Sequence, residues 1–274
     1  MRLRLSFQSF ERSIWLSHTH TCRQPIKSAL YFFIGVLGWY DILSCATTRA
    51  APFPARKYLD MGVGYIPLEK LMGCENWAML IIMDIAVLQE WKARSQTGGN
   101  LSLPELVSRG AEIEQHLEKL LEKNTENIAN HQESHVSSPI LNSTSVLSIT
   151  RIFACAALIY LHVVVSGPYP QLPEIRNAVC QTIDAFRSLP DQKLVRNLTW
   201  PCCIAGCMAI EEQEVFFRAF EPTTSSPLPK FGISSKVLAV IEECWSIRKR
   251  NGPGAGPADW NTAMESLELN LLLV

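Results

Sequence analysis

The sequence predicts an all-α protein. Apolar residues recur at intervals of three and four along most of the chain, as on one face of a helix, and the strict alternation typical of strands is almost absent. Breaks rich in proline, serine and glycine separate these periodic segments. Because 47% of the 274 residues are apolar and 19% are charged, the chain can bury a sizeable core. We therefore expect an irregular bundle, or stack, of antiparallel helical hairpins.

Three segments of the chain are strongly apolar. The first spans residues 29–40, and the others span residues 81–91 and 152–165. The last two are apolar on nearly every side, which predicts helices at the centre of the fold. Residues 29–40 and 152–165 are both shorter than the roughly 20 residues that cross a bilayer. We interpret them as buried core helices and expect no contact with a membrane.

Three further helices are predicted as amphipathic. Their apolar stripes are Leu106, Ile113, Leu117, Leu120 and Leu121; Ile175, Val179, Ile183 and Phe186; and Val237, Val240, Ile241 and Cys244. The first helix follows a capping-box pattern from Ser102 to Glu105. The second lies between Pro173 and Pro190, because proline suits the first turn of a helix and interrupts its interior.

The last predicted element is a helix through Trp260, Met264 and Leu267, followed by the apolar run Leu269–Val274. Because water penalises exposed leucines, we expect this run to pack against the core. Deleting Leu269–Val274 should then destabilise or aggregate the protein. Deleting Met1–Arg23 should leave the melting temperature nearly unchanged.

These elements are expected to form one helical domain over residues 27–274. A long polar loop is predicted at residues 131–145, which are rich in serine and asparagine. Residues 1–26 form a short basic N-terminal segment that can be disordered. The other predicted breaks are residues 50–56, 96–100, 167–173, 221–230 and 251–257.

The formal net charge is −1. Proteins that grip duplex DNA normally carry a clear basic excess, because much of their affinity comes from neutralising phosphates. We therefore expect no specific DNA binding by this chain alone. Its nine cysteines are an odd number, and several lie inside apolar runs. This pattern favours a reducing compartment over a disulfide framework.

Several cysteines are candidates for chemistry, but a structural role fits each of them better. Cys202, Cys203 and Cys207 lie close in sequence without a histidine or fourth cysteine nearby, so we interpret them as core residues rather than metal ligands. Cys155 and His162 are two helical turns apart and share a face without touching. An apolar segment opposes the lowered thiol pKa that catalysis needs, and His162 is expected to be a core or interhelix histidine.

The charged clusters are also interpreted as structural. They are Glu211, Glu212 and Glu214; Glu242 and Glu243; and Arg248, Lys249 and Arg250. The acids are expected on solvated helix faces, and the basic run is expected to stabilise a helix end rather than to act as a nuclear-import signal. Asp84 and Glu90 could be buried partners of Lys92 or Arg94. We expect no catalytic residue, cofactor or metal, and therefore no enzyme.

Short segments along the chain together resemble a known family. The segments are Phe32–Ser44, Met72–Trp77, Ala86–Lys92, Thr199–Pro201 with Cys207, and Asp259–Trp260 leading to Leu271–Val274. In order and spacing, from about Lys27 to the C-terminus, they resemble the regulatory domain of fungal zinc binuclear-cluster transcription factors. This domain is called the fungal-specific transcription factor domain.

The resemblance implies a helical, nuclear domain that modulates transcription. It would act through other transcription factors, the transcription machinery or a small-molecule effector. Many proteins of this kind lie beside fungal secondary-metabolite genes. The DNA-binding module of such factors needs six cysteines with two Cys-x-x-Cys pairs, and this chain has no Cys-x-x-Cys. The resemblance therefore implies regulation without direct DNA recognition.

Two other functions stay open at this point. A small-molecule sensor would need an apolar cavity, for which Trp39, Tyr40, Trp77 and Phe153 are the candidate lining. A helical enzyme would need polar groups such as Asp41, Glu75 and His162 to converge in one pocket. A cytoplasmic location is the alternative to the nucleus, and the sequence contains no feature that sets the oligomeric state.

Overall fold

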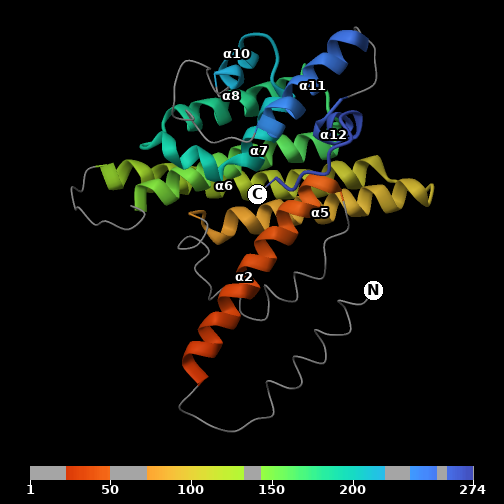
Figure 1. Ribbon diagram of the computed structural model, residues 1–274. Coiled ribbons are helices and arrows are strands. Elements are labelled where there is room, and N and C mark those ends of the chain that lie inside the picture. Colours follow the sequence, from red (N-terminus) through yellow and green to blue (C-terminus); the bar gives the residue numbers. More distant parts are fainter. Residues whose placement is uncertain (1–22, 50–72, 133–142, 220–234, 252–257, 274) are drawn as a thin grey trace.

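The computed structural model describes residues 23–49, 73–132, 143–219, 235–251 and 258–273 (Figure 1). These residues form nine α-helices, one 3-10 helix and no strand, so the predicted all-α class is confirmed. The elements are α2 (Arg23–Thr48), α5 (Asn76–Thr97), α6 (Leu103–Gln132), α7 (Ser143–Ser166), α8 (Pro173–Arg187), η2 (Gln192–Asn197), α9 (Thr199–Met208), α10 (Glu212–Arg218), α11 (Ser235–Asn251) and α12 (Trp260–Ser266).

Helix α7 is the centre of the fold, and α5, α6, α8 and α9 pack around it. Every residue from Leu147 to Val164 is buried except Arg151. By length and composition alone, this 24-residue helix could cross a membrane, and it is the one such helix among the described residues. In the most apolar part of this helix, 89% is buried within the fold. Helix α7 is therefore the core helix that the sequence predicted.

Helix α7 begins earlier than predicted. Its first turns are polar, so the apolar pattern did not reveal them. Ser148 Oγ donates a hydrogen bond to the Thr144 carbonyl (2.8 Å), and Thr150 Oγ1 donates to the Val146 carbonyl (2.7 Å). Hydroxyls that are satisfied within their own helix can be buried at little cost. The polar residues that suggested a loop are therefore part of the helix.

Helices α6 and α7 form an antiparallel pair. Gly110 of α6 lies against Val165 near the end of α7, and the Glu114 carboxylate lies 3.7 Å from His162 Nε2 one turn further along. A Cβ atom at Gly110 would come within 2.7 Å of Val165 Cγ2. Glycine therefore allows the two helices to approach this closely.

Helix α5 lies along α7 in the parallel direction. At one end, the Glu75 amide donates to Thr150 Oγ1 (2.9 Å), and at the other end Lys92 Nζ donates to the Val164 carbonyl (2.6 Å). Helix α6 also packs against α5. The three helices therefore form consecutive antiparallel hairpins, as predicted.

The predicted amphipathic stripes face the core. Those of α8 and α11 are buried along their whole length, and in α6 Leu106 and Leu117 are buried. The other three members of the α6 stripe are partly buried against the core. Val87 of α5 is exposed, so the segment at residues 81–91 is not enclosed on every side as predicted.

The capping box at the start of α6 is half formed. Ser102 Oγ accepts a hydrogen bond from the Glu105 amide (3.4 Å). The Glu105 carboxylate does not complete the box, because it pairs with Arg109 one turn along the helix (2.6 Å). An exposed pair of this kind adds a few tenths of a kcal/mol to the helix, roughly 0.3–0.5.

Several predicted breaks need correction. Both ends of the predicted loop at residues 131–145 are helical, because α6 continues to Gln132 and α7 begins at Ser143, and the residues between them lie outside the described part of the chain. Helix α2 begins at Arg23, inside the predicted N-terminal segment 1–26. The breaks at residues 50–56 and 221–230, and most of the break at residues 251–257, lie outside the described residues.

A chain of aromatic rings connects the elements at the centre. Trp39 of α2 packs edge-on to Phe153 of α7 (5.3 Å between centroids), and Phe153 stacks on Trp200 of α9 (6.1 Å). Tyr160 of α7 meets both Trp200 and Trp260 of α12 edge-on (6.1 and 6.0 Å). Such pairs contribute roughly 0.5–1.5 kcal/mol beyond the area they bury.

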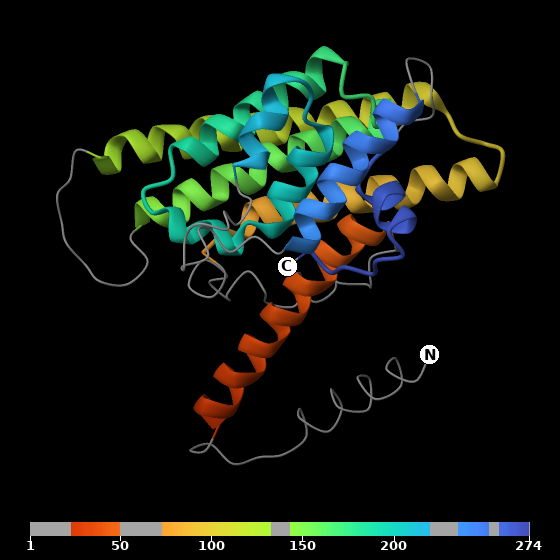
Figure 2. The same cartoon turned by 45° about the horizontal axis from the view of Figure 1, so that its top comes forward.

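Helix α2 belongs to the bundle over only part of its length. Ile42, Leu43 and Ala46 in its C-terminal half are buried. The N-terminal half projects away from the bundle, as Figures 1 and 2 both show.

Candidate functional site

Helix α2 carries exposed apolar side chains in its projecting half and in the turns that follow it. Phe32, Phe33, Leu37 and Tyr40 are 44%, 60%, 54% and 41% exposed, and we call these four residues the α2 face. Phe33, Leu37 and Tyr40 follow one another at intervals of four and three residues, which places them on the same side of the helix. Between Lys27 and Asp41 the sequence has no charged residue.

A contiguous exposed apolar surface usually marks a contact site. Fully burying a side chain of this size contributes on the order of 1.5–3 kcal/mol, so leaving four of them about half exposed forgoes part of that stabilisation. Single exposed hydrophobic residues are normal, but an apolar stripe on a projecting helix is typical of protein–protein interaction surfaces.

The α2 face corrects the prediction of a buried core helix at residues 29–40. The sequence pattern shows that this segment is apolar, but apolar residues do not by themselves indicate how far a helix extends beyond its bundle. Trp39 in the same run is buried, with 4% of its surface exposed, whereas its neighbour Tyr40 is exposed. Residues 29–40 therefore include both a side chain that attaches α2 to the core and side chains that remain exposed.

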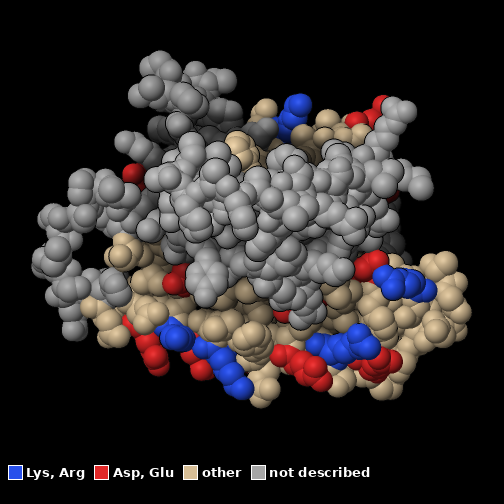
Figure 3. Space-filling model, turned by 90° about the horizontal axis from the view of Figure 1, so that it is seen from below, with Lys and Arg blue, Asp and Glu red and all other residues tan. Residues whose placement is uncertain are grey.

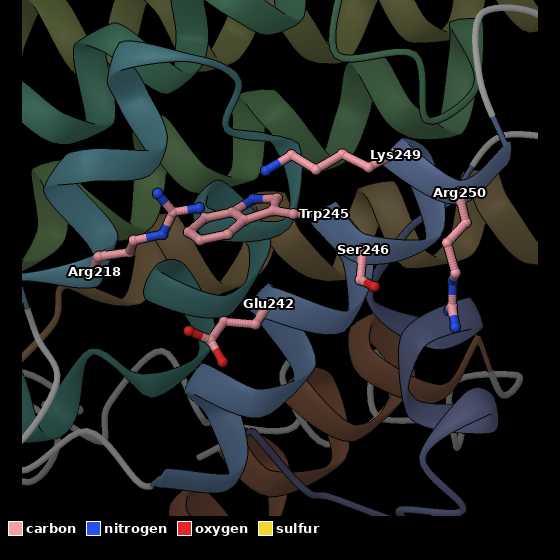
Figure 4. Close-up of a pocket in the computed structure, with 6 residues that line it drawn as sticks. All are labelled: Arg218, Glu242, Trp245, Ser246, Lys249 and Arg250. Atoms are coloured by element: carbon pink, nitrogen blue, oxygen red, sulfur yellow. The ribbon is translucent and has the colours of Figure 1, made fainter.

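A hollow of about 380 Å³ lies between α10 and α11 (Figure 4). Its lining residues are Arg218, Glu242, Trp245, Ser246, Lys249 and Arg250. The Arg218 guanidinium lies over the Trp245 ring, 4.9 Å from the ring centroid. The hollow therefore has an aromatic wall with positive charge beside it.

The cations around this hollow are already paired within the protein. Glu214 accepts from Arg218 (2.8 Å) and from Lys249 (3.3 Å), and Glu243 accepts from Arg250 (2.6 Å). An anionic ligand would have to compete with these carboxylates. The charge available to attract such a ligand is accordingly small.

The acidic residues divide into two groups. Glu211, Glu212 and Glu242 are exposed, in agreement with the predicted solvated faces. Glu214 and Glu243 correct that prediction, because only 12% and 17% of their side chains are exposed. Their basic partners lie on the same or neighbouring helices. The sequence pattern could not indicate that α11 supplies a partner to Glu214.

Glu243 also joins α11 to α12. Its carboxylate accepts a hydrogen bond from Ser266 Oγ at 2.8 Å. This bond, followed by the contact with Arg250, lowers the pKa of the Glu243 carboxyl. Glu243 is therefore held as a charged structural residue rather than as a proton donor.

The basic run stabilises a helix end, but not that of its own helix. Arg248 donates to the carbonyls of Cys207 and Ala209 (2.7 Å for Ala209), which lie at the C-terminal end of α9. Cations at a helix C-terminus interact favourably with the helix dipole. Because Lys249 and Arg250 are also paired, the structural interpretation is favoured over a nuclear-import signal.

The cysteines of α9 lie in the core. Cys202, Cys203 and Cys207 are fully buried. Burial raises the pKa of Cys202 and Cys207, which keeps both as neutral thiols. Cys244 of α11 packs against them, with its Sγ 3.5 Å from the Cys207 carbonyl. The sequence did not reveal Cys244 as a neighbour, because it lies on a distant helix. The burial of the three α9 cysteines agrees with the predicted core packing.

Cys155 and His162 also behave as core residues. Burial raises the pKa of the Cys155 thiol to about 11, which opposes a nucleophilic role. His162 is buried between α7 and α6, as predicted for an interhelix histidine. Burial lowers its pKa, and the nearby Glu114 acts in the opposite direction.

Of the buried pairs predicted for Asp84 and Glu90 with Lys92 or Arg94, the pair of Glu90 with Arg94 forms, but it is not buried. The Arg94 side chain is 73% exposed, so this pair lies at the surface. Lys92 instead donates to the Val164 carbonyl (2.6 Å). Burial, reinforced by the charge of Arg49, lowers the pKa of Lys92.

The groups proposed for a ligand cavity or an enzyme site do not converge. Trp39 and Phe153 are in ring contact inside the core, and Tyr40 is exposed on the α2 face. The Glu75 amide binds Thr150, which precedes His162 by twelve residues on α7. Because a helix rises about 1.5 Å per residue, Glu75 and His162 lie about 18 Å apart along it.

We expect no specific DNA binding by the chain alone. On the face shown in Figure 3, described basic side chains alternate with acidic ones, and the net charge is −1. In fluorescence-anisotropy titrations at about 0.15 M salt, labelled duplexes should bind no more tightly than roughly 10⁻⁶ M. A sequence-dependent Kd of about 10⁻⁸ M, typical of specific complexes, would contradict this expectation.

Comparison with known proteins gives a consistent set of relatives. Residues 7–274 match the family described as the fungal specific transcription factor domain. The chain is 37% identical over 252 residues to the trichothecene biosynthesis transcription regulator TRI10 of Fusarium sporotrichioides, covering 89% of this chain and 54% of the relative. It is 35% identical over 242 residues to the transcription factor dibT of Pestalotiopsis microspora, covering 81% and 38%.

A third relative is more distant in sequence. The chain is 30% identical over 255 residues to the ustiloxin B cluster transcription factor ustR of Aspergillus flavus, covering 90% of this chain and 43% of the relative. The chain thus spans about half or less of the length of these relatives. No solved structure matches the sequence.

Proposed function

Because this chain belongs to the fungal specific transcription factor domain family, we propose that it regulates transcription of a secondary-metabolite pathway through contacts with other proteins. The names of its relatives support this proposal, since they are a trichothecene biosynthesis regulator and a ustiloxin B cluster transcription factor. The chain spans about half or less of those proteins, so pathway control by this chain is part of the proposal. Its place of action would be the nucleus.

The α2 face is the observation that carries this proposal. It offers aromatic side chains, which are enriched at the centres of protein interfaces, beside the aliphatic Leu37. Since the stretch between Lys27 and Asp41 has no charge, recognition would rest on shape and apolar burial. The partner that fits is a transcription factor or a component of the transcription machinery with an apolar helix or groove.

A tethering assay tests the regulatory role. The whole chain is fused to a heterologous DNA-binding domain and expressed in a filamentous fungus that carries a reporter with the matching operator. The fusion should change reporter transcription in either direction relative to the DNA-binding domain alone. Equal reporter output from the two proteins, at equal nuclear abundance, would count against a regulatory role for this chain.

A small-molecule effector is the second candidate, and the hollow between α10 and α11 is the observation that favours it. Its volume of about 380 Å³ falls within the range of ligand pockets, although at the low end. An effector would lie against Trp245 and contact the Arg218 guanidinium beside the ring. A thermal-shift screen with metabolites should then show a ligand whose stabilising effect is lost in Arg218→Gln. A screen without any stabilising metabolite would leave protein contacts as the mode of control.

A further inference from the structure

The end of α2 is held by the beginning of α12, more than two hundred residues later in the chain. Trp260 Nε1 donates a hydrogen bond to the Thr47 carbonyl at 3.2 Å. Carbonyls in the last turn of a helix have no partner within the helix, so α12 satisfies one that α2 leaves open. Trp260 is fully buried and in edge-on contact with Tyr160 of α7. The contact is therefore anchored in the core.

Asp259 connects the two helices through its two carboxylate oxygens. Oδ1 caps α12, because it accepts from the Asn261 and Thr262 amides and from Thr262 Oγ1, each at 3.1 Å. Oδ2 pairs with the guanidinium of Arg49, the residue that directly follows α2. Asp259 is 1% exposed, whereas the Arg49 side chain is 43% exposed. One buried carboxylate thus starts α12 and fixes the chain at the end of α2.

The backbone at Arg49 shows how firmly this end is held. Arg49 has a φ of 56°, in the left-handed region that residues other than glycine seldom adopt. Such a conformation is unfavourable for residues other than glycine and persists where surrounding contacts stabilise it. Among the described residues, the ion pair with Asp259 and the bond from Trp260 to Thr47, two residues earlier, stabilise it here.

We infer that α12 is a latch that, together with the buried Trp39 and Ile42, sets the direction in which α2 leaves the bundle. Phe32 and Phe33 of the α2 face belong to the N-terminal half of α2, which projects from the bundle (Figures 1 and 2), and the latch holds the opposite end of the same helix. Release of α12 would free the end of α2 and allow the α2 face to reorient. Docking of α12 and partner binding at the α2 face would then be coupled. This coupling rests on the proposed function, whereas the mechanical link between α12 and α2 does not.

Hydrogen–deuterium exchange on the full chain tests the latch without any partner. Arg49→Gln and Asp259→Asn each remove the ion pair, and both leave an N-cap acceptor for α12 because asparagine caps nearly as well as aspartate. If the latch exists, amide exchange should accelerate roughly tenfold both at residues 41–48 and at residues 260–267 in each variant. Exchange in α6 and α8 should stay unchanged.

Arg94→Gln is the matched control, because it removes an exposed ion pair with Glu90 on α5. It should leave both segments as protected as in the wild type. Faster exchange at α12 with unchanged exchange at α2, or no change at either, would overturn the latch. If Asp259→Asn fails to fold, the result for Arg49→Gln decides the question. The Arg49 side chain is partly exposed, so its replacement should leave the protein folded. The tethering assay can fail while this result holds, so the two ideas are separable.

Discussion

Replacing Leu273 by alanine is expected to lower the free energy of unfolding by about 2–5 kcal/mol. Leu273 is fully buried and belongs to the core cluster. Leu269 and Leu271 pack beside the core as well, so the final segment is held in place along its length. In a chain of this size the change corresponds to a fall in melting temperature of roughly 5–15 °C, measurable by circular dichroism.

Leu272→Ala is the matched control for this prediction. Leu272 is the adjacent leucine, but it is 47% exposed. Its replacement should shift the melting temperature by no more than about 2 °C, because surface substitutions usually change stability by less than about 0.5 kcal/mol. Equal melting temperatures for the two variants would show that the C-terminal segment is frayed. For the same reason, deleting Leu269–Val274 is expected to destabilise or aggregate the protein.

The second large effect is expected at Gly206 of α9. A Cβ atom there would lie 2.6, 2.9 and 3.2 Å from three side-chain carbons of Ile241 on α11. Ile241 is itself buried, so it has little room to move. Gly206→Ala should therefore destabilise the protein by about 1–3 kcal/mol, the usual cost of overpacking. An ordinary glycine-to-alanine change within a helix instead stabilises the protein.

Gly38 on α2 provides the contrast. A Cβ atom at Gly38 would have no atom within 4 Å. Because alanine favours the helix over glycine by about 0.5–1 kcal/mol, Gly38→Ala should raise the melting temperature slightly. Urea titration of the two variants should give midpoints on opposite sides of the wild type. A lower midpoint for both variants would contradict this account of the two glycines.

Local patterns in the sequence were sufficient to predict most of the described helices, though not α9, α10 or η2. The stripes of α8 and α11 are read from residues three or four positions apart, and such residues share a face in any helix. The same reasoning predicted the core positions of Cys155 and His162. It failed at the start of α7, where Ser148 and Thr150 are satisfied by backbone carbonyls within the helix.

Contacts between distant segments could not be predicted in this way. Glu214 pairs with Lys249 of another helix, Arg248 binds a carbonyl at the end of α9, and Trp260 binds a carbonyl near the end of α2. No periodicity in a single sequence specifies such pairs. The α2 face was missed for a related reason. The apolar character of residues 29–40 is visible in the sequence, but the point at which the bundle ends is set by tertiary packing.

The central claim is that the α2 face is the surface through which this chain regulates transcription, and the tethered reporter tests it most directly. The variant is Phe33→Glu with Leu37→Glu, and the control is Leu103→Glu with Val107→Glu on α6. Both pairs are spaced four residues apart, and the control pair is 66% and 57% exposed, close to the values for the α2 pair. Glutamate at all four positions is solvated, so both proteins should fold.

We expect the α2 variant to return reporter output to the level of the DNA-binding domain alone, because a partner would have to bury two charges. The α6 control should retain the effect of the wild-type fusion. Nuclear abundance and melting temperature, measured for all three proteins, exclude loss of fold as the cause. Full reporter activity in the α2 variant, at wild-type abundance, would contradict the claim that this face makes the regulatory contact.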